Sequence, residues 1–225
     1  NYPSAKVIYN DFDDYSSRLK MINETESLRI RLSSIISNEK KKAKIRADIK
    51  QKLVDIIKAS NCTDWITLSS WLLFSCKYAH SLDELVRSSW YANIAQTPLS
   101  CEGYLSGVER VQYDFRELFN LYKNQSDVIF IADPPYTATS QEGYSNNNDG
   151  KYFGLRASID CIKLLYDKQV LLFSSAKSET HELLDVWKPK SLSVMDYNAS
   201  LGAGQKAIER LYFLNWQGES VTPLQ

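Results

Sequence analysis

The second half of the chain alternates between two hydrophobic periodicities, and this alternation limits the fold more than any other feature. Short runs rich in β-branched and aromatic residues, typical of strands, are separated by stretches with helical spacing. The predicted strands cover residues 108–113, 128–132, 169–175, 191–198 and 207–216. Strands that alternate with helices favour an α/β fold with a parallel sheet. The last two strands are joined by only about eight residues, too few for a crossover helix, so one of them should run antiparallel.

Helices are predicted between these strands, over residues 114–126, 155–168 and 177–187. Asp114 and Ser178 stand at the starts of the first and the last of them. Both are residue types that accept hydrogen bonds from the free N–H groups of a first helical turn. We therefore expect each to cap its helix.

The first half of the chain has a different pattern, with one strand-like run and then helical spacing. The β-branched run at residues 5–10 predicts a strand, while residues 38–60, 63–80 and 81–89 predict helices and residues 90–107 a loop. We interpret residues 24–107 as a helical insertion that stands apart from the strand–helix alternation.

Composition excludes little, but it narrows the class of protein. Lysine plus arginine and aspartate plus glutamate both number 27, so the net charge is zero, although a neutral total is compatible with a basic face. No apolar run approaches the about 18 residues of a membrane span. The cysteines lack metal-ligand spacing, so we expect reduced thiols, no metal and a cytoplasmic protein. They are Cys62, Cys76, Cys101 and Cys161.

An acidic residue follows each of three predicted strands. Asp11, Asp114 and Asp133 occupy these positions. In an open α/β sheet, ligands bind at the carboxyl ends of the strands. Three acids at one edge would suit a site that holds hydroxyl and amino groups.

The sharpest local signal is the sequence Asp133-Pro134-Pro135-Tyr136, directly after a strand-like run. Two prolines fix two φ angles and remove two N–H groups, which makes a stiff, extended turn with exposed carbonyls. A carboxylate, a carbonyl and an aromatic face together suit a flat heterocycle that carries an exocyclic amino group. The alternative is a rigid turn in which the aspartate has no function.

The run "VIFIADPPY" resembles the catalytic motif of S-adenosylmethionine-dependent amino methyltransferases. The order of segments is similar to that of the D12 class of N6-adenine DNA methyltransferases: an acid-ended strand, a helical insertion, D-P-P-Y and the remaining strands. The resemblance implies a Rossmann-like methyltransferase sheet formed by residues 1–23 and 108–225. It also implies that residues 24–107 form a helical target-recognition insertion.

The resemblance also implies roles for individual residues. Asp11 matches the acid that binds the ribose hydroxyls of S-adenosylmethionine, and the alternative is a helix N-cap. Asp114 and Phe115 match the segment near the cofactor adenine, although Asp114 is also a good N-cap. The residues of the D-P-P-Y motif match the site of a flipped adenine in double-stranded DNA, with Asp133 also adjoining the cofactor. They are Asp133, Pro134, Pro135 and Tyr136.

One feature of the family is not found. Its members begin with a strand and a glycine-rich F-x-G-x-G segment that holds the methionine part of the cofactor, and nothing similar precedes Asn1. The "LGAGQ" sequence at residues 201–205 lies between two late strands instead. The interpretations left open are a truncated enzyme, a split enzyme completed by the same or another chain, and a non-catalytic remnant that binds DNA or a partner.

The insertion offers candidate DNA contacts. The lysine-rich stretch at residues 40–52 could face phosphates, or it could be an ordinary solvated helix face. The aromatic and polar loop that follows could read base edges or fill the gap left by a flipped base, or it could be purely structural. The candidates are Lys41, Lys44, Arg87, Trp90, Tyr91, Asn93, Gln96 and Tyr104.

Two further points concern the target. The polar loop at residues 139–154 is a candidate lid over the flipped base. The family tends toward S-P-P-Y for N4-cytosine targets and N-P-P-Y for RNA or protein targets, so Asp133 favours adenine while those alternatives stay open. His80 and His181 are isolated in the sequence, and we expect no catalytic role for either.

Overall fold

The computed structural model describes residues 5–11, 13, 15–74, 77–136, 153–200 and 206–216, without the side chains of residues 200 and 206. The described residues up to Gln112 form one compact unit, and those from Tyr113 onward form a second. None of the described helices is both long and apolar enough to cross a membrane. The candidate lid at residues 139–154 falls almost entirely outside the described ranges.

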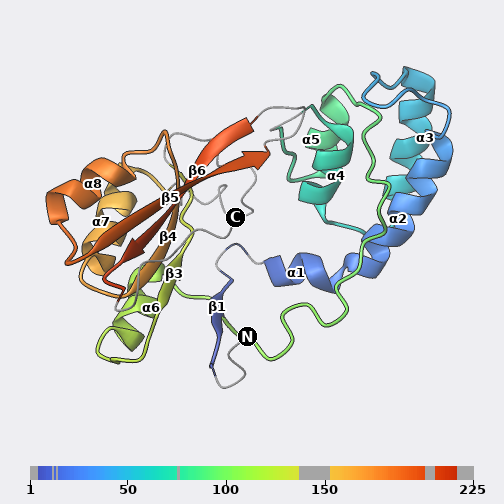
Figure 1. Cartoon of the computed structure of the whole chain (residues 1–225). Helices are drawn as coiled ribbons and strands as arrows, with labels where there is room; N and C mark the ends of the chain where they lie inside the picture. Colours follow the sequence, from blue (N-terminus) through green and yellow to red (C-terminus); the bar gives the residue numbers. More distant parts are fainter. Residues whose placement is uncertain are drawn as a thin grey trace. The chain divides into compact units, whose positions relative to one another are not determined.

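The first unit is mainly helical (Figure 1). Its helices are α1 (Tyr15–Lys20), α2 (Ile22–Ile35), α3 (Ala47–Lys58), α4 (Trp65–Leu72) and α5 (Leu82–Arg87). In α3 the buried residues recur at helical spacing and face a common core with α2, α4 and α5. The largest fully buried side chains of this core are Trp90, Leu28, Leu32, Leu53, Leu68, Leu72 and Leu85.

Two of the predicted helices are wrong in extent. The helix expected over residues 38–60 begins only at Ala47, because the backbone of residues 42–45 hydrogen-bonds to residues 90–92 instead. Lys42 has a positive φ of 64°, and its N–H donates to Ala92 O at 2.7 Å. The helix expected over residues 63–80 ends at Leu72.

A parallel pair of short strands also belongs to the first unit. Strand β1 (Ile8–Asn10) pairs with β2 (Glu109–Val111), residue for residue. Both strands lie within the runs expected to be extended, so these predictions are confirmed over shorter ranges. The ladder continues one step further, because Asp11 N–H donates to Val111 O at 2.8 Å.

The second unit is a mixed sheet with helices. Its strands β3 (Phe130–Ala132), β4 (Val170–Ser175), β5 (Leu192–Ser200) and β6 (Lys206–Leu214) are ordered β3-β4-β6-β5. β3 and β4 are parallel, whereas β6 is antiparallel to both of its neighbours. This confirms the prediction that one of the last two strands runs against the others.

Helices α6 (Phe115–Tyr122), α7 (Leu155–Leu165) and α8 (Thr180–Trp187) complete this unit (Figure 1). Their buried residues pack with β4 and β6 in a second hydrophobic core. Asp114 caps α6 as expected, since its carboxylate accepts from Arg116 N–H at 2.8 Å. The N-cap of α8 is Glu179 rather than Ser178, although the Ser178 hydroxyl still accepts from Thr180 N–H at 3.4 Å.

Candidate active site

The D-P-P-Y turn leaves the sheet at the carboxyl end of β3, next to the parallel strand β4. The Tyr136 hydroxyl folds back and donates to Asp133 Oδ1 at 3.3 Å. The motif therefore brings its carboxylate and its aromatic residue together. This hydrogen bond joins two residues of the predicted target-base site directly.

Both titratable groups of the turn have shifted pKa values. The surrounding protein raises the pKa of the Asp133 carboxyl by desolvation, and the hydrogen bond from Tyr136 offsets part of this increase. The pKa of Tyr136 lies far above its usual value, because of burial and the nearby carboxylates of Asp133 and Glu209. Tyr136 is consequently a hydrogen-bond donor at any physiological pH.

A small pocket lies beside the turn. Pro134, Pro135 and Tyr136 line it together with residues of α7 and of the start of α8. Three hydroxyls form a closed triangle beside it: Ser174 to Ser178 at 2.5 Å, Ser174 to Thr180 at 2.7 Å, and Ser178 to Thr180 at 2.9 Å. Because each hydroxyl both donates and accepts, the triangle ties the end of β4 to the start of α8. Ser178 and Thr180 of this triangle line the pocket.

Glu209 is a site residue that the sequence alone did not reveal. It lies on β6, in register with Ser175 on β4 and Tyr197 on β5, and its carboxylate contributes to the raised pKa of Tyr136. Its Oε2 is buried and has no hydrogen-bond partner within the described ranges. The only sequence signal was a charged residue inside an otherwise strand-like run, and the register was needed to place it near Asp133.

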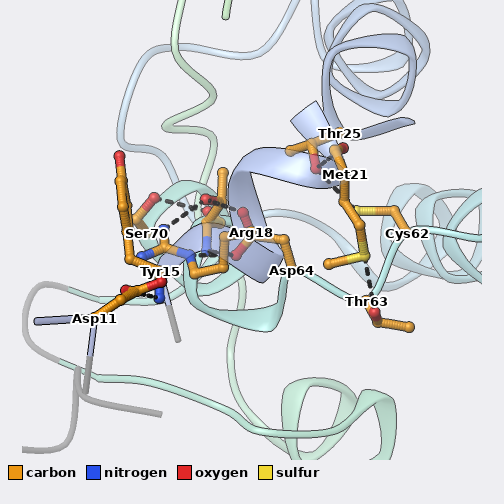
Figure 2. A network of polar contacts seen from close by, with 10 residues as sticks. Asp11, Tyr15, Arg18, Met21, Thr25, Cys62, Thr63, Asp64 and Ser70 are labelled. Atoms are coloured by element: carbon orange, nitrogen blue, oxygen red, sulfur yellow. Dashed lines mark hydrogen bonds and ion pairs between the residues drawn. The ribbon is translucent and has the colours of Figure 1, made fainter. Parts of the chain in front are cut away.

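Asp11 is buried, with 4% of its surface exposed, at the carboxyl end of β1 (Figure 2). Its two carboxylate oxygens accept from the backbone N–H groups of Tyr15, at 2.7 Å, and Ser16, at 2.9 Å. The capping alternative for Asp11 is thus realised. A carboxylate offers about four lone-pair positions, so the predicted contact with ribose hydroxyls stays a prediction.

The helix capped by Asp11 is fixed to α4 by a polar network (Figure 2). Arg18 donates to Asp64 Oδ1 and to the Thr67 hydroxyl, both at 3.0 Å. Asp64 is itself the N-cap of α4 and accepts from Thr67 N–H. The guanidinium of Arg18 also lies 5.2 Å from the ring centre of Tyr15. The segment after Asp11 is therefore held by charged hydrogen bonds as well as by packing.

Asp114 and Phe115, the predicted cofactor-adenine segment, belong to the second unit with Asp133. Asp114 forms an ion pair with Arg116 at 3.1 Å, and Arg116 also binds Asp160 at 2.8 Å. The ring of Phe115 lies 4.3 Å beneath the Arg116 guanidinium and 5.8 Å from the ring of Phe153. Asp114 thus has structural partners, and its contact with a cofactor stays a prediction.

The predicted DNA contact at Trp90 is wrong in this structure. Its side chain is 1% exposed, and its indole N–H donates to Leu85 O at 2.7 Å. The ammonium of Lys50 lies 5.2 Å from the ring centre and donates to the carbonyls of Val86 and Ser88. Burial lowers the pKa of Lys50. Trp90 and Lys50 are therefore part of the framework that holds the loop.

The other candidate DNA contacts remain on the surface. Tyr91 and Asn93 are half-buried, and the rest are exposed or half-exposed: Lys41, Lys44, Arg87, Gln96 and Tyr104. Tyr91 pairs with Lys44 through an isolated antiparallel bridge. Its ring meets the edge of Phe74 at 5.8 Å, and Phe74 is 63% exposed. The sequence pattern had placed Phe74 inside a helix over residues 63–80, so this aromatic surface was missed.

Among the described residues, metal ligands and histidines add no further candidate to the site. No group of three acidic, cysteine or histidine side chains suited to a metal is present in the described part of the chain. The ring of His181 stacks on the ring of Tyr212, with 6.1 Å between the ring centres. In sequence, both residues are distant from the D-P-P-Y turn. His80 lies before α5, where its N–H donates to Glu84.

Comparison with known proteins gives one informative relative. The chain is 35% identical over 187 residues to a Haemophilus influenzae protein named "Putative methyltransferase". The match covers 79% of this chain, which spans 60% of the length of that relative. No family model matches the sequence, and no solved structure matches the chain.

Proposed function

We propose that this chain carries the target-base site of an S-adenosylmethionine-dependent DNA methyltransferase that acts on N6 of adenine. The observation that carries the proposal is the pairing of Asp133 with Tyr136 in a proline-stiffened turn at the carboxyl end of a parallel strand. The relative named as a methyltransferase supports the class of reaction. The parallel β3–β4 pair with helices around it is compatible with a Rossmann-like sheet.

The proposed chemistry needs positioning more than a strong base. The N6 amino group of adenine is a poor nucleophile because its lone pair is delocalised into the ring. If Asp133 and the Pro134 carbonyl accept its two hydrogens, the lone pair turns out of the ring plane and the ring rests on Tyr136. S-adenosylmethionine, when bound, supplies an electrophilic methyl group. Holding the nitrogen in line with that methyl would provide much of the rate.

The residues expected to hold the cofactor fit it in part. Asp11 has acceptor capacity beyond its two backbone bonds, which suits ribose hydroxyls. Phe115 offers an aromatic ring beside the cap of α6, which suits the adenine. These residues would bind and orient the cofactor, whereas Asp133 would hold the target amino group.

The test uses the full-length protein and a duplex that contains adenine. With labelled S-adenosylmethionine, the product should be N6-methyladenine, and Asp133→Ala should lower transfer by at least about 10²-fold with the fold intact. Asp127→Asn, at an exposed position before β3, is the matched control and should transfer normally. Full transfer by Asp133→Ala would refute the assignment, and a product of N4-methylcytosine would move it to cytosine.

The second candidate is a non-catalytic chain that binds DNA or a partner. It is favoured by the geometry of Asp11, whose two oxygens both serve the backbone of α1. Calorimetry with S-adenosylmethionine separates the two functions. Saturable binding that weakens in Asp11→Ala, judged against an unchanged unfolding temperature, supports the enzyme, while the absence of binding by the full-length protein supports the second candidate.

A further inference from the structure

We propose that Glu209 is a positioning residue of the target-base site. It accepts the hydrogen bond of the Tyr136 hydroxyl when Asp133 binds the target amino group. The inference rests on the proposed function, because it concerns how Asp133 becomes available to a substrate. It involves residues of the second unit only, on the turn after β3 and on β6.

Tyr136 has fewer hydrogens to donate than there are acceptors around it. A tyrosine hydroxyl has one hydrogen to donate, whereas the carboxylates of Asp133 and Glu209 can only accept when ionised. Tyr136 donates to Asp133, and the Glu209 carboxylate is near enough to raise the pKa of Tyr136 as well. The separation of the Tyr136 hydroxyl from Asp133 Oδ1 is 3.3 Å, longer than the about 2.5–3.0 Å of a good O–H···O bond. One hydrogen therefore serves Asp133, while Glu209 is a second acceptor for it.

The Oε2 atom of Glu209 is buried, and no described residue donates to it. A buried acceptor without a partner is costly, so a stronger bond from Tyr136 would be favourable there. The strand fixes this position, because β6 pairs with β4 at Ser175 and with β5 at Tyr197. The backbone of Glu209 cannot move away without disturbing two strand pairs.

Without a substrate, the Tyr136 hydroxyl occupies part of the acceptor capacity of Asp133. An amino group that binds Asp133 supplies its own N–H donors, and the tyrosine hydrogen can then turn fully to Glu209. No hydrogen bond is lost in this exchange. If Glu209 could not accept, substrate binding would have to compete with the Tyr136 bond without a replacement.

The experiment is a double-mutant cycle on the full-length protein, with methyl transfer as the readout. Glu209→Met removes the acceptor and keeps a similar volume, and Tyr136→Phe removes the shared hydroxyl. We expect Glu209→Met to lower kcat/KM about tenfold, the equivalent of one lost hydrogen bond. In the Tyr136→Phe background the same change should have less than about a twofold effect. Equal losses in both backgrounds would overturn the proposal.

Glu209→Gln and Glu117→Ala are the controls. The side-chain amide oxygen that Glu209→Gln introduces still accepts a hydrogen bond, so transfer should stay within about threefold of the wild type. Glu117 is exposed on α6, and its removal should change nothing. A loss of about tenfold in Glu209→Gln would show that charge rather than acceptance matters, which contradicts the exchange.

A second measurement needs no methyl transfer. In a crystal structure of Glu209→Met, the distance from the Tyr136 hydroxyl to Asp133 should shorten from 3.3 Å into the usual range below about 3.0 Å. An unchanged distance would overturn the proposal. If the wild-type protein transfers no methyl group, the proposed function fails, and this distance still tells whether the two carboxylates compete for Tyr136.

Discussion

Asp133 is the residue on which the proposed chemistry depends, and the surrounding protein raises the pKa of its carboxyl. Desolvation raises the pKa of its carboxyl, whereas the bond from Tyr136 lowers it by less. A carboxyl with a raised pKa binds its proton more tightly in the folded than in the unfolded protein. Its protonation therefore stabilises the fold, and this contribution is lost as the pH rises through the folded-state pKa.

We therefore expect Asp133→Asn to stabilise the protein at pH 7. Because Asp133 is exposed, the unfolding temperature should rise by no more than about one degree, and the difference should vanish below about pH 4, where the wild-type carboxyl is also protonated. Thermal unfolding followed by circular dichroism from about pH 3 to pH 8 measures this, with Asp127→Asn as the control. A variant less stable than the wild type at pH 7 would contradict the account.

At the scale of elements, an ion pair connects α2 to the loop that carries the candidate DNA contacts. Arg29 binds both carboxylate oxygens of Glu26 at 2.7 Å and also donates to Ala95 O at 2.9 Å. Glu26 accepts in turn from Leu99 N–H at 2.9 Å. The bond from Arg29 is the main reason that the pKa of Glu26 is lowered to about 2, against the opposing effect of burial. The pair therefore fixes the loop to α2, and it keeps Glu26 ionised at neutral pH.

We expect Glu26→Gln to lower the free energy of unfolding by about 2 kcal/mol at pH 7, because the charged hydrogen bonds are lost. A lowered pKa stabilises the fold above the unfolded-state value of 4.5, and this contribution disappears as the pH falls toward 2. Urea unfolding at several pH values measures the difference, with the exposed Glu24→Gln on the same helix as control. A difference independent of pH would argue for packing instead.

Local chemistry allowed several elements to be predicted. The cap of α6 follows from Asp114, and the parallel and antiparallel strands of the second unit follow from the lengths of their connections. The start of α3 did not follow, because pairing with residues 90–92 outweighs the helical tendency of the lysine-rich stretch. Glu209 and Phe74 were missed for a similar reason: their surroundings come from distant parts of the sequence.

At the scale of the whole molecule, DNA binding tests the proposed partner. Lys41 and Lys44 are exposed in the segment before α3, and Lys44 pairs with Tyr91 beside Phe74. A lysine bound to phosphate releases counterions, and each such contact contributes about −0.9 to the slope of log K against log salt concentration.

Replacing both Lys41 and Lys44 by alanine should therefore make that slope less steep by about 1 to 2, with similar losses on every duplex sequence. Fluorescence anisotropy over a salt series measures it. Lys58 is exposed at the end of α3. Lys58→Ala also removes one positive charge, so it is the control for each single lysine substitution. A double variant with an unchanged slope would remove this segment from the DNA interface.

The strand that leads to the D-P-P-Y turn has one more consequence. Among the described strands of its sheet, β3 pairs with β4 alone, and Ile131 on it is 70% exposed. If this edge has no partner in the whole protein, another strand can add to it, from any chain that supplies one. Self-association and catalysis would then involve the same few residues. An Ile131→Lys change made to keep concentrated protein soluble would place a positive charge only two positions from Asp133 and alter its acidity.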